Sequence, residues 1–154
     1  MLLASALGAG GFIWWVTALI TAVFPNKRAA AWQMLLAGAF TWAISEYALK
    51  PAFDRVRPYE IDSSITVIDA RPDTPAFPSG HAAMAVAYAL AGSRMIPGSA
   101  WIWWPLALVV AISRVYLGVH WPSDVLGGAV VGLICAWFAL GGPRPAPVSL
   151  TPQN

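Results

Sequence analysis

The sequence predicts an all-α fold: an integral-membrane helical bundle of about five transmembrane helices with one long extracytoplasmic loop. Of its 154 residues, 58% are hydrophobic and only 10% are charged, and the mean hydropathy is +0.64. Soluble domains carry about 25% charged residues, so this composition indicates a protein of the bilayer. Five apolar segments approach the roughly 17–25 residues that a helix needs to cross the hydrocarbon core. They are residues 2–24, 29–49, 80–97, 100–117 and 122–141.

These spans make up one membrane domain, residues 1–141, because the chain has the length of a single domain and shows no internal repeat. The first span lacks a basic start and exceeds the length of a signal-peptide core, so we expect it to remain as an anchor. Residues 142–154 are rich in proline and polar side chains and are expected to form a flexible cytoplasmic tail. The polar connection 51–78 has little helical period, which is typical of a functional loop.

The charged residues divide between the two membrane surfaces. One side carries basic residues without acids, namely Lys27, Arg28, Arg94 and Arg144. The other side carries the acids Asp54, Glu60, Asp62, Asp69, Asp73 and Asp124. Because positive loops mark the cytoplasm, we expect the acidic side to face outward, with the N-terminus outside and the C-terminus inside.

Composition also excludes some classes of protein. The net charge of +2 is too small and too scattered for nucleic-acid binding, so no nucleic-acid partner is expected. The single cysteine, Cys135, lies in an apolar segment, so no intrachain disulfide forms. We expect its side chain to be a small buried hydrophobic group.

Small and aromatic residues in the last two spans predict how these helices pack. Gly128 and Gly132 lie four positions apart, a spacing that suits helix dimerisation but more commonly serves close packing within one bundle. Trp101, Trp103 and Trp104 lie where the fourth span enters from the cytoplasmic side, and we expect them to be interfacial anchors.

Three polar clusters, residues 50–58, 78–81 and 113–124, interrupt the apolar chain and contain both histidines. Lys50 ends the second span, and His81 opens the third. Arg114 closes the fourth span, and His120 and Asp124 open the fifth. The predicted topology places all of them at one membrane surface. This arrangement indicates an anion-binding reaction centre.

The residue types suit a phosphate group. Arg57 and Arg114 offer planar forks that match phosphate oxygens in pairs, and Lys50 adds a compact point charge. Ser79 and Gly80 lie at the predicted start of a helix, where free backbone N–H groups and the helix dipole favour an anion. Gly80 allows close approach of the backbone, and the hydroxyl of Ser79 adds a hydrogen bond.

The two histidines can divide the catalytic work. The carboxylate of Asp124 can accept a proton from one nitrogen of His120, four residues earlier, leaving the other nitrogen free to attack. His81 then protonates the departing oxygen. This chemistry is in-line phosphoryl transfer through a phosphohistidine, with three cations neutralising the phosphate oxygens. No carboxylate cluster has the spacing typical of Mg²⁺ binding, so no metal and no cofactor are expected.

Each residue taken singly has a structural interpretation too. An isolated interfacial histidine is more often structural, and arginine at the end of a span usually reaches toward lipid headgroups. Glu46 lies four residues before Lys50 and can pair with it, a contact that can also orient the lysine. Arg55 and Arg71 can meet a headgroup or remain solvated loop charges, and the latter is the simpler expectation. The location of all the clusters at one surface favours the reaction centre.

These clusters resemble the type-2 phosphatidic acid phosphatase superfamily, membrane lipid phosphate phosphatase branch; the superfamily also includes vanadium-dependent haloperoxidases. The family pattern has a lysine, six residues and Arg-Pro; then Pro-Ser-Gly-His; then Ser-Arg, five residues, His, three residues and Asp. Lys50 to Pro58, Pro78 to His81 and Ser113 to Asp124 meet every spacing. The resemblance covers residues 50–124.

The resemblance implies the same division of roles. His120 is the nucleophile, Asp124 its partner and His81 the general acid. The phosphate is held by Lys50, Arg57, Ser79, Gly80 and Arg114. It also implies a metal-independent enzyme with its site on the extracytoplasmic face of the bacterial cytoplasmic (inner) membrane. Bacterial membrane members usually have six spans, and five are predicted here; either the first helix is dispensable or a neighbour in a homo-oligomer supplies the missing surface.

The predicted function is hydrolysis of a lipid phosphate or diphosphate whose tail stays among the membrane lipids. Undecaprenyl diphosphate is favoured, and phosphatidylglycerophosphate, phosphatidic acid and lipid A phosphates are the other substrate classes of the bacterial family. A phosphotransferase that passes the phosphoryl group to another lipid is the main alternative. A vanadium-dependent haloperoxidase is disfavoured, because those relatives are larger soluble proteins. A non-enzymatic assembly protein is disfavoured because no motif residue is lost.

Overall fold

The computed structural model describes residues 12–68 and 71–142. The start of the first predicted span, Asp69, Arg144 and most of the predicted tail therefore lie outside the described residues. Every regular element in the described part is helical, which confirms the all-α class. The elements are α2 (Phe12–Val23), η2 (Pro25–Lys27), α3 (Arg28–Ala43), η3 (Ile44–Leu49), α4 (Lys50–Phe53), α5 (Pro58–Ile61), α6 (Gly80–Met95), α7 (Ala100–Tyr116) and α8 (Pro122–Ala139).

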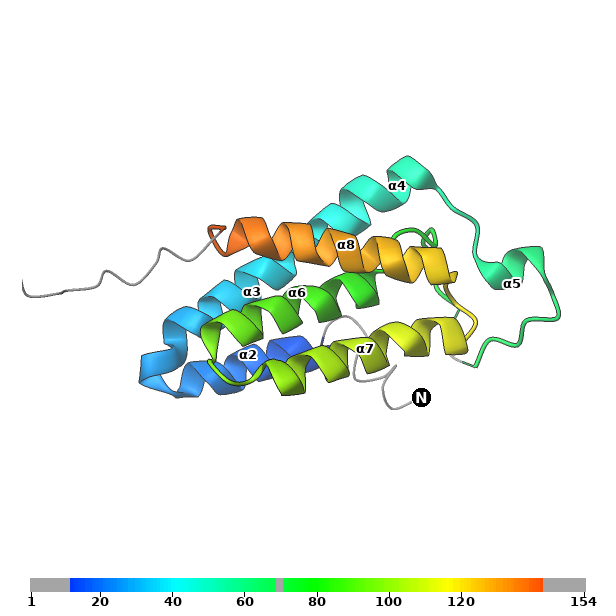
Figure 1. The fold of residues 1–154 in the computed structure, drawn as a ribbon. Coiled ribbons are helices and arrows are strands. Elements are labelled where there is room, and N and C mark those ends of the chain that lie inside the picture. The colour runs from blue at the N-terminus through cyan, green and yellow to red at the C-terminus, as the bar shows by residue number, and fades with distance from the viewer. Residues whose placement is uncertain (1–11, 69–70, 143–154) are drawn as a thin grey trace, which may run out of the picture.

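Helix α6 is the centre of the bundle and packs against α3, α7 and α8 (Figure 1). Its sequence explains this position, because alanines fill most of the positions from Ala82 to Ala91 and are buried. Small side chains let neighbouring backbones approach closely on every side. Helix α2 packs on α3 at the edge of the bundle.

The contact between α6 and α8 is made by backbone and small side chains. A Cβ atom added to Gly128 would lie 2.4 Å from the carbonyl oxygen of Ser79. A Cβ atom added to Gly132 would lie 2.2 Å from the carbonyl oxygen of Ala83. Neither approach leaves room for a methyl group, so the two glycines allow the helices to touch. This confirms the prediction that the pair serves packing within the bundle.

The outer faces of the helices carry large apolar side chains. Exposed examples on four helices are Leu19, Leu36, Leu108, Leu126 and Phe138. In the described part of the chain, one helix, α8, has both the length and the hydropathy of a membrane span. Helix α7 is also apolar but, with 17 residues, is shorter. Each of the five predicted segments thus contains a described helix, while α8 alone among these helices meets the criteria for a membrane span.

Trp103 is not the interfacial anchor that the sequence suggested. It is only 7% exposed and packs over Gly92 of α6, where an added Cβ would lie 2.6 Å from the indole. Its indole nitrogen donates a hydrogen bond of 2.8 Å to the hydroxyl of Ser99. Trp101, by contrast, is 75% exposed. Adjacent tryptophans on a helix point in different directions, so a single role for all three was wrong.

The second long helix continues beyond its predicted end. Helix α3 runs without a break through the π-helical turn η3 into α4, which ends at Phe53. A proline normally loses one hydrogen bond and clashes with the carbonyl four residues earlier. The N–H of Lys50 donates to the carbonyl of Ser45, so the turn before Pro51 is wider than an α-helical turn. The helix continues through the proline at this wider turn. The connection therefore begins at Asp54, whose φ of 38° ends α4, and it contains the short helix α5.

Candidate active site

The predicted polar residues lie on elements that meet at one end of the bundle (Figure 1). Lys50 begins α4, Arg57 precedes α5, and Ser79 precedes α6. Arg114 lies in the last turn of α7 and Asp124 in the first turn of α8. All five are buried, and so is His120. Charged side chains are seldom buried unless they are paired or functional, so this cluster is the natural candidate site.

A backbone hydrogen bond fixes two of these elements directly. The N–H of Ser79 donates to the carbonyl of Asp124 at 3.0 Å, which joins the start of α6 to the start of α8. This places His81, in the first turn of α6, beside the segment that carries His120. The imidazole of His81 lies within electrostatic range of His120 and of three cations, namely Arg114, Lys50 and Arg57. The structure thus brings together residues from all three sequence clusters.

Lys50 is held by two oxygen-bearing side chains. Its Nζ donates 2.8 Å hydrogen bonds to Oε2 of Glu46 and to Oγ1 of Thr74. The second carboxylate oxygen of Glu46 also lies 2.8 Å from Nζ. Glu46 thus orients Lys50, one of the two roles that the sequence allowed. Because both residues lie mostly away from solvent, the pair fixes the ammonium group firmly at the site.

The guanidinium of Arg57, only 2% exposed, is largely occupied by the protein itself. Nε donates to the carbonyl of Thr74 at 2.8 Å, and Nη1 donates to the carbonyl of Val119 at 2.7 Å. Nη2 makes longer contacts of 3.4 Å to Oγ1 of Thr74 and to the carbonyl of Pro75. An arginine has five N–H donors. One Nη1 hydrogen therefore has no acceptor among the described residues, and the fork predicted for phosphate is mostly used to fasten two loops together.

Helix α6 begins at Gly80, directly after Ser79. The side chain of Ser79 accepts a long hydrogen bond, 3.5 Å, from the N–H of Ala82 and so caps the helix. At Gly80 an added Cβ would lie 2.9 Å from Oε1 of Glu46. A side chain at this position would therefore displace the carboxylate that holds Lys50. At the end of α7, Nε and Nη2 of Arg114 lie 3.1 Å from the hydroxyl of Ser113.

His120 and Asp124 face each other across a slightly long gap. Nδ1 of His120 lies 3.6 Å from Oδ2 of Asp124, just beyond hydrogen-bond distance. Oδ2 accepts a 2.8 Å hydrogen bond from the N–H of Trp121, which fixes the carboxylate at the start of α8. Burial is the main cause that lowers the pKa of His120 below its usual value, against the opposing effect of Asp124. The imidazole is therefore favoured in the neutral form that a nucleophile requires.

Arg55 belongs to the cluster, contrary to the expectation of a solvated loop charge. Its Nη1 donates to Oδ1 of Asp124 at 2.8 Å and to the hydroxyl of Ser123 at 2.7 Å. The guanidinium also lies 5.9 Å from the ring centre of Trp121. The sequence offered one signal, since a buried Asp124 needs a cation and Arg55 precedes a motif arginine by two residues. Arg71 is instead an exposed loop residue that stacks on Tyr59 at 5.3 Å.

Thr74 is the site residue that the sequence analysis missed. It lies in the long connection and touches both Lys50 and Arg57. A threonine in an irregular polar loop carries no spacing signal, so nothing in the sequence singled it out.

The donor set also bears on metal binding. In residues 12–68 and 71–142, no group of three or more His, Cys, Asp or Glu side chains could hold a metal ion. The two carboxylates beside the histidines, Glu46 and Asp124, are paired with Lys50 and Arg55. The absence of a cofactor remains a prediction from the sequence.

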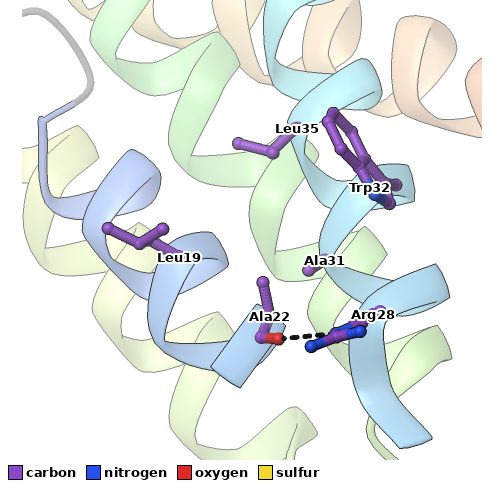
Figure 2. Close-up of a pocket in the computed structure, with 6 residues that line it drawn as sticks. All are labelled: Leu19, Ala22, Arg28, Ala31, Trp32 and Leu35. Atoms are coloured by element: carbon purple, nitrogen blue, oxygen red, sulfur yellow. Dashed lines mark hydrogen bonds between the residues drawn. The ribbon is translucent and has the colours of Figure 1, made fainter. Parts of the chain in front are cut away.

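A separate apolar groove of about 480 Å³ lies between α2 and α3, at the other end of α3 from Lys50 (Figure 2). Its lining residues are Leu19, Ala22, Arg28, Ala31, Trp32 and Leu35. Nε of Arg28 donates a 3.4 Å hydrogen bond to the carbonyl of Ala22 and closes one end of the groove. The groove contains none of the motif residues.

Comparison with known proteins shows the family to which the chain belongs. Residues 27–144 match the model of the PAP2 superfamily. The chain belongs to the PAP2 superfamily, which confirms the resemblance drawn from the three motifs.

Two curated relatives are phosphatases by their names. The chain is 26% identical over 122 residues to an undecaprenyl-diphosphatase of Sulfolobus acidocaldarius, covering 79% of this chain and 59% of the relative. It is 35% identical over 124 residues to a decaprenylphosphoryl-5-phosphoribose phosphatase of Mycobacterium tuberculosis, covering 77% of this chain and 65% of the relative. The chain thus spans less than two thirds of the length of either relative.

The fold is also that of a solved relative. A transmembrane PAP2-type phosphatidylglycerolphosphate phosphatase from Bacillus subtilis superposes with a TM-score of 0.71 at 28% identity. The alignment covers 90% of this chain and 72% of that structure. The helices of this chain therefore share the arrangement of a membrane PAP2 protein.

Proposed function

We propose that the protein is an integral-membrane, metal-independent lipid phosphate phosphatase that works through a phosphohistidine intermediate. The observation that carries this proposal is the buried cluster at one end of the bundle, in which two histidines lie among Lys50, Arg57 and Arg114. Fixed cations in a site shielded from water suit the negative charge of a phosphoryl group.

Binding of the phosphate uses groups that are already held in place. The ammonium group of Lys50 is fixed by Glu46 and Thr74, so it meets the anion without further ordering. Arg114 and the remaining N–H of Arg57 contribute charge and hydrogen bonds. Ser79 and the N–H groups at the start of α6 complete the cradle, because a helix N-terminus favours an anion.

The chemical step follows from the orientation of His120. Its Nδ1 faces Asp124, so Nε2 is the nitrogen that attacks phosphorus. As the Nε2–P bond forms, the bond from phosphorus to the lipid oxygen breaks and its electrons pass to that oxygen. His81 in its protonated form gives this oxygen a proton. Water then attacks phosphorus, His81 takes back a proton, and the N–P bond breaks to release phosphate and His120.

The location proposed for this chemistry is the extracytoplasmic face of a bacterial cytoplasmic membrane. The apolar outer faces of α3, α7 and α8 support a bundle within lipid, as does the likeness to a transmembrane relative. In this arrangement the five helices cross the bilayer and the lipid tail of the substrate stays among them. Association into a homo-oligomer remains a prediction.

Undecaprenyl diphosphate is our first candidate for the substrate. The names of the two curated relatives above both refer to polyprenyl compounds, which supports this choice. The solved relative acts, by its name, on phosphatidylglycerolphosphate, so that lipid is the second candidate. Phosphatidic acid and lipid A phosphates complete the panel to be tested.

The proposal is tested by phosphate release from these lipids with purified protein in detergent. We expect release from at least one lipid, unchanged activity in EDTA and inhibition by orthovanadate, which resembles the five-coordinate phosphorus of the transition state. The variant His120→Ala is the matched inactive control. Labelled phosphate recovered on a second lipid would identify a phosphotransferase instead. Loss of activity in EDTA that Mg²⁺ restores would contradict the metal-independent scheme, and bromide oxidation with vanadate would indicate a haloperoxidase.

A further inference from the structure

The hydroxyl of Thr74 lies between two of the predicted phosphate-binding cations. Its Oγ1 accepts a 2.8 Å hydrogen bond from Nζ of Lys50 and a longer contact, 3.4 Å, from Nη2 of Arg57. Lys50 and Arg57 come from separate segments, α4 and the loop before α5, so Thr74 joins them at a single oxygen.

The hydrogen-bond count leaves the proton of this hydroxyl without an acceptor. Lysine and arginine side chains only donate, so Oγ1 uses its lone pairs to receive both contacts. The O–H of Thr74 cannot be given to either cation, and it makes no hydrogen bond as a donor to any described residue. Two donors that already point at Oγ1 also direct its own proton away from them.

The Thr74 side chain is held in place although the residue as a whole is exposed. Its carbonyl oxygen accepts the 2.8 Å hydrogen bond from Nε of Arg57, so one arginine touches both the backbone and the side chain of Thr74. The hydroxyl is thus a fixed group at the solvent edge of the buried cluster. An anion that contacts both Lys50 and Arg57 must come close to the oxygen that lies between them.

We propose that Thr74 is a phosphate-binding residue whose hydroxyl donates a hydrogen bond to a non-bridging oxygen of the substrate, an inference that rests on the proposed lipid phosphatase function. The proposal fits the state of Arg57, which has one N–H left after fastening the loops at Thr74, Pro75 and Val119. The Thr74 hydroxyl supplies a donor where the arginine fork does not.

The experiment measures binding of orthovanadate by titration, together with phosphate release from the best lipid of the panel. Thr74→Val removes the hydroxyl with little change in shape, Thr74→Ser keeps it, and Thr74→Ala is a second deletion in case the valine variant folds poorly. Thr66→Val makes the same change at another exposed threonine of the same connection. Glu46→Gln perturbs Lys50 from its other side and leaves the Thr74 hydroxyl in place.

We expect Thr74→Val to weaken orthovanadate binding and to lower kcat/KM by about tenfold, as for loss of a hydrogen bond to a charged group. Thr74→Ser and Thr66→Val should stay close to the parent protein, and Glu46→Gln should weaken binding clearly less than Thr74→Val does. Equal losses in Thr74→Val and Glu46→Gln would show that Thr74 acts only by positioning Lys50, and unchanged binding in Thr74→Val and Thr74→Ala would also overturn the proposal.

The two proposals fail in different ways. If the parent protein binds orthovanadate but releases phosphate from no lipid, the phosphatase function is wrong, and the binding series alone decides the role of Thr74. If the parent protein is active and the threonine variants match it in binding and turnover, the function stands and the role of Thr74 is wrong.

Discussion

The guanidinium of Arg55 lies 2.8 Å from Oδ1 of Asp124, the carboxylate that also faces His120. Because Oδ2 of Asp124 accepts the N–H of Trp121, both carboxylate oxygens are held by other groups while the imidazole lies alongside. Arg55 therefore orients the partner of the proposed nucleophile from a position that is 40% exposed. It is a positioning residue at the edge of the site.

The first prediction concerns this contact. Arg55→Gln should lower kcat/KM roughly ten- to hundredfold, by analogy with the groups that orient the ligands of a metal site. Loss of the cation also leaves Asp124 to favour the charged imidazole more strongly, so the acidic limb of the pH profile should move to higher pH. The measurement is the steady-state rate between about pH 4 and pH 8, a range that spans the usual histidine pKa. Arg71→Gln, an exposed arginine of the same connection, is the control, and equal profiles for both variants would remove Arg55 from the mechanism.

The second prediction is loss of turnover in His120→Ala with the fold retained. Removing a nucleophile should lower kcat by at least about 10³-fold. Phosphate release gives the rate, and thermal unfolding in detergent reports on the fold. After reaction with a substrate labelled in its phosphate group and an alkaline quench, the label should remain on the parent protein. It should be absent from the variant. A variant that releases phosphate at a near-parent rate would exclude His120 as the nucleophile.

The third prediction separates His81 from His120 by leaving group. His81→Ala should slow phosphoenzyme formation most for poor leaving groups, because these need a proton as the bond breaks. A pair of soluble phosphate esters, one with a nitrophenolate and one with an alkoxide leaving group, would measure the difference. Equal losses for the two esters would argue against His81 as the acid.

The fourth prediction is the acidic limit of activity. Burial lowers the pKa of His120, and attack requires the neutral ring. A lowered pKa means that the ring stays neutral to lower pH, so the acidic limb of kcat/KM should lie below the usual histidine value of about 6.5. Rates must be corrected for the second ionisation of the substrate phosphate. A corrected limb above that value would contradict the arrangement around His120.

The fifth prediction tests the contact of α6 with α8. Gly132→Ala places a methyl group 2.2 Å from the carbonyl of Ala83, so it should destabilise the fold by about 1–3 kcal/mol or more. The measurement is the midpoint of thermal unfolding in detergent. Val130→Ala on the exposed side of the same helix is the control, and it should unfold near the parent temperature. A Gly132→Ala protein as stable as this control would mean that the two helices are not in close contact.

Much of the site was predictable because its spacing is local. Pro78 to His81 and His120 to Asp124 each lie within one turn of a helix start, so their relation follows from helix geometry. The order of the spans and the direction in which each crosses the membrane predicted that these groups lie at one surface. The four-residue spacing of Gly128 and Gly132 likewise predicted close packing within the bundle, but not which helix they contact.

The remainder depends on contacts between segments that have no regular period. Arg55 and Thr74 lie in the connection between α4 and α6, where the path of the chain decides which side chain reaches which partner. The continuation of the helix through Pro51 depends on a π-helical turn, which breaks the period used to recognise a helix. Trp103 was misread because a short aromatic run does not reveal which ring faces the neighbouring helix.

The contact of α6 with α8 makes two properties of the protein independent of each other. One is the position of the polar cluster, and the other is the character of the outer surface. The backbone bond from Ser79 to Asp124 and the carbonyls beneath Gly128 and Gly132 are independent of the large side chains outside the bundle. We expect substitutions on those outer faces to leave the starts of α6 and α8, and with them the two imidazoles, in place. The outer surface can therefore differ between related proteins while the arrangement of the polar cluster is kept.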